Sequence, residues 1–253
     1  MPRSPFALML LPLLLAACAP AEATIDDESG GSEEDVLDLG PQQSDSIESA
    51  LVTGPQVVFV NFGGPTVCDN ATDYAPHNKS NIMCPFFGVC GKCKDFAAYA
   101  GSDKAAIVST LKGYYSAYDV QVVTSRPSSG PYTMVVVSPT FGPHHGVAAL
   151  DCGNHNRNGV AFVLRTADSF YTSIAGGNRA KGIAKAAAHE LGHSFGLGHR
   201  GTVNSASTDH MDVWSRGSAW NTGPTSDSGN CVGGTGKTQN SDALLAAGLG
   251  RHP

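Results

Sequence analysis

The chain has 253 residues, a formal net charge of −6 and 15% charged residues. This length suits one large domain or two small ones, and the charged fraction lies well below the ~25% of average proteins, which excludes a charged coil or a coiled coil. A net acidic chain without basic clusters also argues against nucleic acid as a partner.

The first eighteen residues are predicted to be an export signal. Arg3 supplies the positive start, and residues 6–17 form an apolar stretch shorter than the ~20 residues of a membrane span. Residues 15–18 read Leu-Ala-Ala-Cys, which resembles the lipobox of bacterial lipoproteins. The resemblance implies that Cys18 is acylated and anchors the chain in the outer membrane or at the cell surface of a bacterium. Ordinary secretion, with Cys18 in a removed signal, is the alternative.

Residues 19–50 are predicted to be an acidic, disordered tether. They contain ten acidic residues and no Lys or Arg, and Ser and Gly fill much of the rest. Such a composition does not bury enough apolar surface to order itself. A sharper interpretation is a latency segment that masks an active site. The catalytic domain is then expected at residues 51–253, which are mildly positive, with 15 basic and 12 acidic residues.

Six cysteines remain in this domain if Cys18 is lipidated. An even number in an exported chain indicates three disulfides, although six cysteines allow 15 connectivities. Four of them cluster within residues 68–93, so we expect two local bridges there and a long bridge between the other two. The Cys-x-x-Cys spacing at 90–93 also suits half a zinc site or a redox pair, but no second such motif completes it. The six candidates are Cys68, Cys84, Cys90, Cys93, Cys152 and Cys231.

The predicted elements define an α+β domain with a mixed sheet. β-branched and aromatic runs predict strands at 56–62, 120–124, 132–137 and 159–164. Helical periodicity predicts helices at 103–117, 178–195 and 241–249, with Ser102 and Asn178 as the caps of the first two. Residues 66–101 and 200–240 are predicted to be irregular. We therefore expect an N-terminal subdomain at about 51–199 and a loop-rich C-terminal subdomain at about 200–253 that ends in a short helix.

The motif that indicates chemistry closes the second helix, where residues 189–199 read His-Glu-Leu-Gly-His-Ser-Phe-Gly-Leu-Gly-His. His189 and His193 are four residues apart, so they share a helix face and can bind one zinc ion. Glu190 is placed to take a proton from a water molecule there. Gly196 can adopt a positive φ and end the helix, which returns His199 as a third ligand. Three protein ligands leave a fourth position open, as in catalytic zinc sites.

These eleven residues resemble the extended motif of the metzincin clan of zinc metalloendopeptidases, HExxHxxGxxH followed by a Met-turn. The resemblance implies one catalytic zinc held by the three histidines, Glu190 as the base, and Met211 as the hydrophobic base of the Met-turn. It also implies a twisted sheet with a backing helix and an active-site helix. The strand at 159–164 is expected to be the edge strand along which substrate binds.

The chain departs from the described metzincin groups at several positions. Arg200 follows His199, where the astacin, adamalysin, serralysin and matrixin groups have other residues, and no Tyr follows Tyr171 to act as an additional ligand. Taken as a whole, the sequence most resembles bacterial matrixin-like lipoprotein peptidases. Matrixins keep a second, structural zinc in a region like the loop that contains four candidate ligands here, but the spacing differs, so we do not expect a second metal. Those four are His144, His145, Asp151 and His155.

The predicted activity is therefore hydrolysis of peptide bonds in a protein or peptide substrate. Zinc would acidify a water molecule and stabilise the oxyanion, and Glu190 would move the proton to the leaving amine. Two alternatives stay open: a surface lipoprotein that binds a partner without cleaving it, and a zinc hydrolase of cell-wall crosslinks. Substrate preference and oligomeric state do not follow from the sequence.

Overall fold

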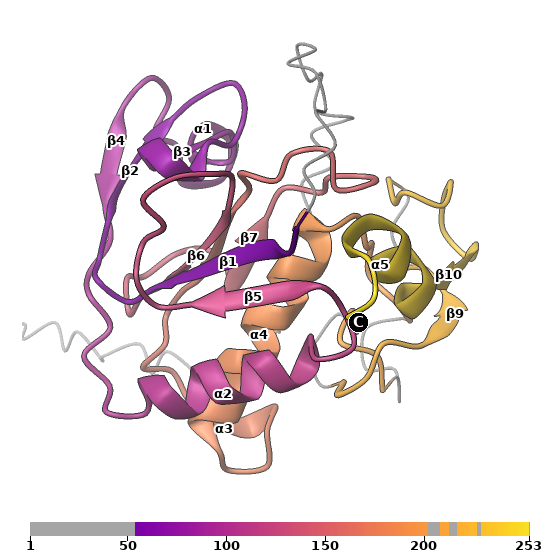
Figure 1. Cartoon of the computed structure of the whole chain (residues 1–253). Helices are drawn as coiled ribbons and strands as arrows, with labels where there is room; N and C mark the ends of the chain where they lie inside the picture. The colour runs from indigo at the N-terminus through magenta and orange to yellow at the C-terminus, as the bar shows by residue number, and fades with distance from the viewer. Residues whose placement is uncertain (1–53, 202–207, 213–216, 227–228, 253) are drawn as a thin grey trace, which may run out of the picture. The chain divides into compact units, whose positions relative to one another are not determined.

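The structure is a computed structural model, which describes residues 54–201, 208–212, 217–226 and 229–252 (Figure 1). The predicted signal, Cys18 and the acidic tether lie outside the described residues. Within the described part of the chain, no helix combines the length and apolar character needed to cross a bilayer.

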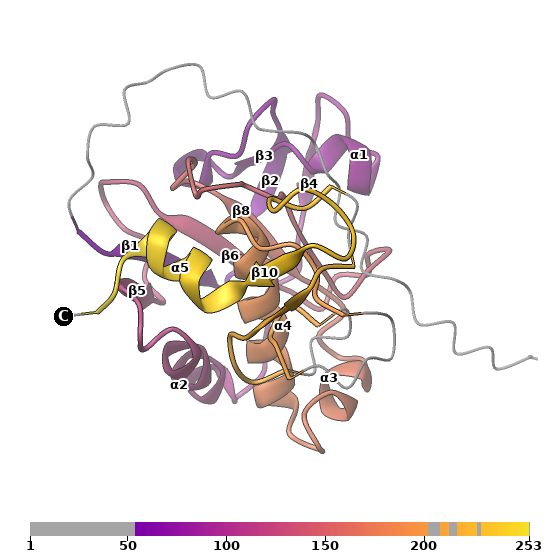
Figure 2. The ribbon, with the colours of Figure 1, turned by 90° about the vertical axis from the view of Figure 1, so that its right-hand side faces the viewer.

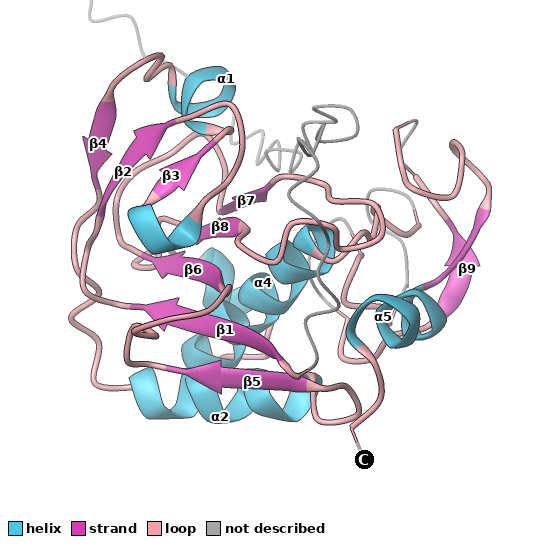
Figure 3. Ribbon diagram, turned by 45° about the horizontal axis from the view of Figure 1, so that its top comes forward, coloured by secondary structure: helices cyan, strands magenta, loops and turns pink. Residues whose placement is uncertain are grey.

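A five-stranded mixed sheet forms the centre of the domain, in the order β5-β1-β6-β8-β7 (Figures 1 and 3). The first four strands run parallel and β7 runs antiparallel to β8. The strand expected at the edge, residues 159–164, is therefore an interior strand, and the prediction that it lines the cleft is wrong. The edge of the sheet next to β8 is formed by β7, which is only three residues long and was not predicted from the sequence. The strands are β1 (Gln56–Asn61), β5 (Val120–Val123), β6 (Thr133–Val137), β7 (Gly146–Ala148) and β8 (Val160–Val163).

Two long helices pack against the sheet, as predicted. α2 spans Lys104–Tyr114 and α4 spans Arg179–Ser194, with the short α3 (Phe170–Ser173) beside α4. The side chain of Asn178 caps α4 by accepting a hydrogen bond from the backbone N–H of Lys181. Ser102 does not cap α2, which begins directly after Asp103; no side chain makes a capping hydrogen bond there.

The sheet has a hydrophobic core on each face because alternate side chains of a strand point in opposite directions. On one face, Val58 and Val135 pack in the cluster that contains the buried face of α2 and most of α4. On the other face, Phe59 and Val136 pack with buried residues of the segment 66–101. The sheet is thus covered by helices on one side and by this segment on the other (Figure 3).

The segment 66–101 is more regular than predicted. It forms a three-stranded sheet in the order β3-β2-β4, together with a short helix α1 and a 3₁₀ turn. Disulfides Cys68–Cys93 and Cys84–Cys90 staple it. A small sheet of this size has little core of its own, so the bridges and its packing against the main sheet hold it. Its elements are β2 (Thr66–Asp69), the turn Ala75–His77, β3 (Lys79–Ser80), α1 (Met83–Phe87) and β4 (Cys93–Asp95).

The C-terminal part carries a two-stranded antiparallel sheet within the stretch predicted to be irregular, and then the expected helix. β9 (Thr222–Pro224) pairs with β10 (Thr238–Asn240), and α5 (Ser241–Leu249) follows directly (Figure 2). Leu245 and Leu249 of α5 join the same core cluster as α4. The long bridge Cys152–Cys231, as expected, ties this part to the segment after β7.

Candidate metal centre and active site

The three histidines of the motif lie together at the C-terminal end of α4. His189 and His193 extend from one face of the helix, and His199 follows after the chain has turned back. The Nε2 atoms of His193 and His199 each lie 3.1 Å from Nε2 of His189, and all three rings are buried. Among the described residues, this is the one group of three or more His, Cys, Asp or Glu side chains close enough to hold a metal ion.

The hydrogen bonds of two rings show that these residues fit a cation. Nδ1 of His189 lies 2.8 Å from the carbonyl oxygen of His210, and Nδ1 of His193 lies 2.7 Å from that of Leu197. A carbonyl only accepts, so each Nδ1 carries the proton and each Nε2 of the neutral ring presents a lone pair. Burial holds the pKa of His189 well below its usual value, which keeps that ring neutral. Lone pairs facing one another repel unless a cation lies between them, and tetrahedral zinc with 2.0–2.1 Å bonds would separate its ligand nitrogens by about 3.3 Å.

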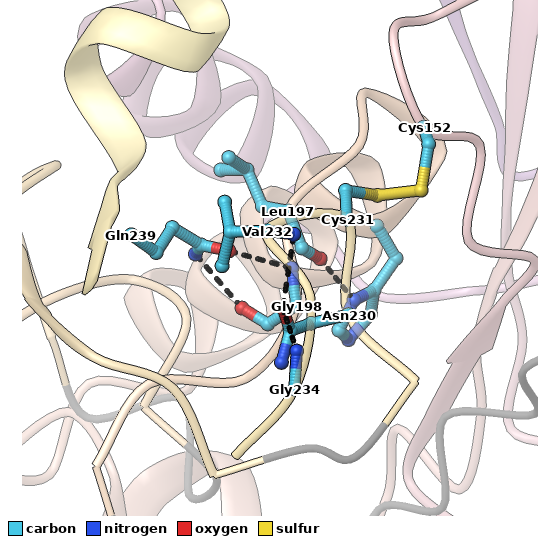
Figure 4. Close-up of a disulfide and its surroundings, with 9 residues drawn as sticks. Cys152, Leu197, Gly198, Asn230, Cys231, Val232, Gly234 and Gln239 are labelled. Atoms are coloured by element: carbon cyan, nitrogen blue, oxygen red, sulfur yellow. Dashed lines mark hydrogen bonds between the residues drawn. A yellow bond between two sulfur atoms is a disulfide. The ribbon is translucent and has the colours of Figure 1, made fainter. Parts of the chain in front are cut away.

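The turn after α4 depends on Gly196. Its φ of 92° lies in the left-handed region, which glycine adopts without strain. A Cβ at this position would also come within 3.0 Å of the backbone of Asp151 and Gly153. The turn therefore packs directly on the segment that carries Cys152. Figure 4 shows the disulfide that joins Cys152 to Cys231.

Met211, which the resemblance predicts to be the Met-turn residue, packs against the active-site helix α4. Its side chain is fully buried and its sulfur lies against the backbone of α4 at Gly192, one residue before His193. Among the described residues, the neighbouring His210 is not part of the three-histidine cluster. Its ring is buried against Tyr114, at a centroid distance of 4.3 Å, and its carbonyl oxygen contacts Nδ1 of His189.

Glu190 is buried and its carboxylate reaches the edge strand. It lies on α4 next to His189, and its carboxylate is so close to Gly146 that a Cβ there would overlap it. Gly146 is the first residue of β7. The carboxylate is therefore held between the active-site helix and the strand at the sheet edge, where an acid–base group could act on a peptide lying along that strand.

The loop residues considered for a second metal do not converge. His145 stacks on Phe170 with a centroid distance of 4.0 Å, and its Nε2 lies 3.4 Å from Asp168. His144 packs instead against Phe86, at 4.8 Å. Asp151 accepts a hydrogen bond from the backbone N–H of Asn156. None of the four candidates, His155 included, belongs to a group of three or more metal-ligand side chains among the described residues.

Several residues that shape the site escaped the sequence analysis. Gly146 and β7 were missed because three residues are too few to show strand alternation; the only signal was the apolar run at 147–150. Gln239 gave no signal at all, yet its buried amide hydrogen-bonds both backbone groups of Gly198. The sequence indicated Arg200 only as a difference from the described metzincin groups. In the structure it forms a buried ion pair with Asp209.

The fold and the site define a class of protein: an α+β domain with a mixed sheet, consistent with the metzincin fold, and a three-histidine cluster suited to zinc. Residues 102–200 match the family model described as metallo-peptidase family M12B, reprolysin-like. The match covers the backing helix α2, the edge strand and all three histidines. Together with the histidine cluster it supports a zinc peptidase of metzincin type. No curated protein matches the chain significantly.

Proposed function

We propose that this protein is an exported zinc endopeptidase that cleaves extended segments of protein substrates. The observation that carries the proposal is the convergence of three imidazole Nε2 atoms at the helix that carries a buried carboxylate, Glu190, which in turn lies against the edge of the sheet. The metzincin-type family match supports the same reaction class. The resemblance of the sequence to bacterial matrixin-like lipoprotein peptidases, a narrower group, stays a prediction.

The edge strand supports binding of an extended peptide. In the described part of the chain, β7 pairs with β8 and with no other strand. Its outer backbone groups are a template on which a substrate segment can add as a further strand. Such a segment would pass the Glu190 carboxylate at Gly146, the position where the strand begins.

Glu190 would carry the proton in the reaction. Zinc bound by His189, His193 and His199 would supply Lewis-acid chemistry, by acidifying a water molecule and polarising the scissile carbonyl. The Glu190 carboxylate would accept the proton of that attacking water and donate it to the leaving amine. The carbonyls of His210 and Leu197 would keep two of the ligand rings in the tautomer that presents Nε2.

Export and lipid anchoring are supported by two features of the chain. The lipobox-like end of the predicted signal places Cys18 where lipoproteins are acylated. The three disulfides suit an oxidising compartment outside the cytoplasm. Secretion without a lipid anchor is the alternative. The two are distinguished by the mass of the mature N-terminus, measured in the membrane and supernatant fractions of a bacterial host.

Cleavage of a protein substrate tests the activity. Purified mature protein loaded with zinc is expected to cleave casein and proteome-derived peptides, and Glu190→Gln should retain zinc but lose about 10²–10⁴-fold in rate. Chelation should abolish cleavage and zinc should restore it. Full activity of the zinc-stripped or Glu190→Gln protein would sink the proposal. Parallel incubation with peptidoglycan distinguishes the cell-wall alternative, and zinc binding without any turnover would indicate the silent binding protein.

A further inference from the structure

The third ligand differs from the other two in what holds it. His189 and His193 are placed by the hydrogen-bonded backbone of α4, whereas His199 lies five residues beyond the last residue of that helix, Ser194. Its position relative to the other rings therefore depends on the contacts of the short segment 197–200. Both residues that flank His199 are bound by side chains from the C-terminal part of the chain.

Gly198, before the ligand, is held by the side-chain amide of Gln239. The backbone N–H of Gly198 donates to Oε1 at 3.0 Å, and Nε2 donates to the carbonyl of Gly198 at 2.9 Å (Figure 4). Gln239 is fully buried in β10, and Nε2 also lies 3.3 Å from Oγ of Ser241. A buried amide that satisfies both groups of one peptide residue fixes that residue in position and orientation.

Arg200, after the ligand, is held by a buried ion pair and by the Met-turn. Nη1 of Arg200 lies 3.2 Å from Oδ2 of Asp209, and the two side chains are only 8% and 0% exposed. The same carboxylate accepts hydrogen bonds from the backbone N–H groups of Met211 and Asn221, at 2.8 and 2.6 Å. The backbone N–H of Arg200 in turn donates to the carbonyl of Met211 at 2.6 Å.

The first ligand is connected to the same short segment. His210, between Asp209 and Met211, accepts the hydrogen bond from Nδ1 of His189. Residues 209–211 thus contact both His189, through the carbonyl of His210, and Arg200, the residue that follows His199. A buried charge is tolerated only when it pairs with an opposite charge and its remaining polar atoms form hydrogen bonds. Asp209 meets both conditions, through Arg200 and through two backbone N–H groups.

We propose that Gln239 and the Arg200–Asp209 pair are positioning residues that hold His199 at the distance required for a third zinc ligand. The inference rests on the proposed function, since it assigns these side chains to the same metal centre. Without them the segment 197–200 would sample other conformations, and closing the site on the ion would carry an entropic penalty that appears as weaker zinc binding. Loss of an outer-shell partner typically weakens metal affinity by about 10–100-fold.

The test is the zinc dissociation constant of the mature protein, measured by competition with a chromophoric chelator. Gln239→Met and Arg200→Met are the test variants, and each has a matched control. Gln56→Met removes a buried glutamine amide in β1 that bonds Thr133, and Arg251→Met removes an exposed ion pair with Asp242. We expect the dissociation constant to rise on the order of 10-fold or more in the test variants and to stay within about twofold in the controls.

Thermal unfolding of the zinc-free proteins separates positioning from general stability. A merely structural role for Gln239 would lower the melting temperature as Gln56→Met does and leave zinc affinity unchanged. Wild-type zinc affinity in folded Gln239→Met and Arg200→Met would overturn the inference; where Arg200→Met does not fold, Gln239→Met alone decides it by the same criterion. A wild-type protein that binds zinc yet cleaves nothing refutes the proposed activity alone, because the affinity differences are measured without substrate.

Discussion

Gly146 and Glu190 touch across the gap between the edge strand and the active-site helix. The carboxylate of Glu190 lies so close to the Cα of Gly146 that any side chain at this position would overlap its Oε1 and Cδ atoms. The candidate base is thus confined by a residue that has no side chain and comes 44 positions earlier in the sequence. The position of the carboxylate is therefore set by two elements, β7 and α4, that are far apart in the sequence.

Replacing Gly146 by alanine should therefore impair catalysis more than folding. The added methyl group displaces the Glu190 carboxylate, and a misplacement of about 1 Å can lower a rate by about 100-fold. Gly159→Ala is the matched control, because a Cβ there meets its nearest atom at 3.4 Å, an ordinary contact. The measurement is kcat/KM on a peptide substrate beside the zinc content. Equal rates in the two variants would contradict the assigned position of the base.

Two glycines within helices should respond to alanine with opposite signs. A Cβ at Gly182 of α4 would overlap the carbonyl oxygen of Tyr171 in α3, so Gly182→Ala should destabilise by about 2 kcal/mol through overpacking. Gly113 of α2 has open space around that position, so Gly113→Ala should stabilise by about 0.5–1 kcal/mol. Urea unfolding of the zinc-free proteins measures both, and a stabilising Gly182→Ala would show that α3 does not pack on α4 in this way.

The disulfides should differ in their contributions to stability because they close loops of different length. Cys152 and Cys231 are 79 residues apart, whereas Cys84 and Cys90 are 6 apart. Chain entropy then predicts a loss of roughly 4 kcal/mol for Cys152→Ser/Cys231→Ser and roughly 2 kcal/mol for Cys84→Ser/Cys90→Ser. Denaturant unfolding at fixed zinc concentration gives the two values. A larger loss from the short bridge would mean that the segment 66–101 supports the main sheet more than its loop length suggests.

Asp73 should make stability fall as the pH rises through the weakly acidic range. Its carboxyl is buried and accepts hydrogen bonds from the backbone of Asn81 and Val160, at 3.0 and 2.9 Å. Burial raises its pKa from 3.8 to about 6, despite these hydrogen bonds. The folded state therefore binds the proton more tightly than the unfolded state, so this contribution is present below pH 3.8 and is lost as the pH approaches 6.

The comparison of wild type with Asp73→Asn isolates this contribution. The difference in unfolding free energy, wild type minus variant, should decrease by about 2 kcal/mol between pH 4 and pH 6.5. Both proteins are measured without zinc, so that the titration of the histidine ligands cancels in the difference. A difference that is constant over this range, or that grows with pH, would show that the carboxyl is not desolvated as the structure indicates.

Local sequence patterns predicted the ligand set and most of the sheet. Two histidines four apart lie on one helix face wherever that helix is placed, and Gly196 permits the turn that returns His199. The strands at 56–62, 120–124, 132–137 and 159–164 were found because each is a run of β-branched and aromatic residues; in β1, β6 and β8 most of these residues are buried. The long bridge between Cys152 and Cys231 followed from the clustering of the other four cysteines.

The order of strands, the edge strand and the support of the third ligand could not be read from the chain. β7 is too short for a periodic pattern, so the sequence predicts the sheet edge at residues 159–164, whereas in the structure β7 pairs with β8 and forms that edge. Gln239 lies 41 positions from Gly198, and no pattern in the sequence predicts that Arg200 pairs with Asp209. A hydrogen bond between distant residues depends on how the whole chain packs, whereas helix spacing depends on backbone geometry alone, which every helix shares.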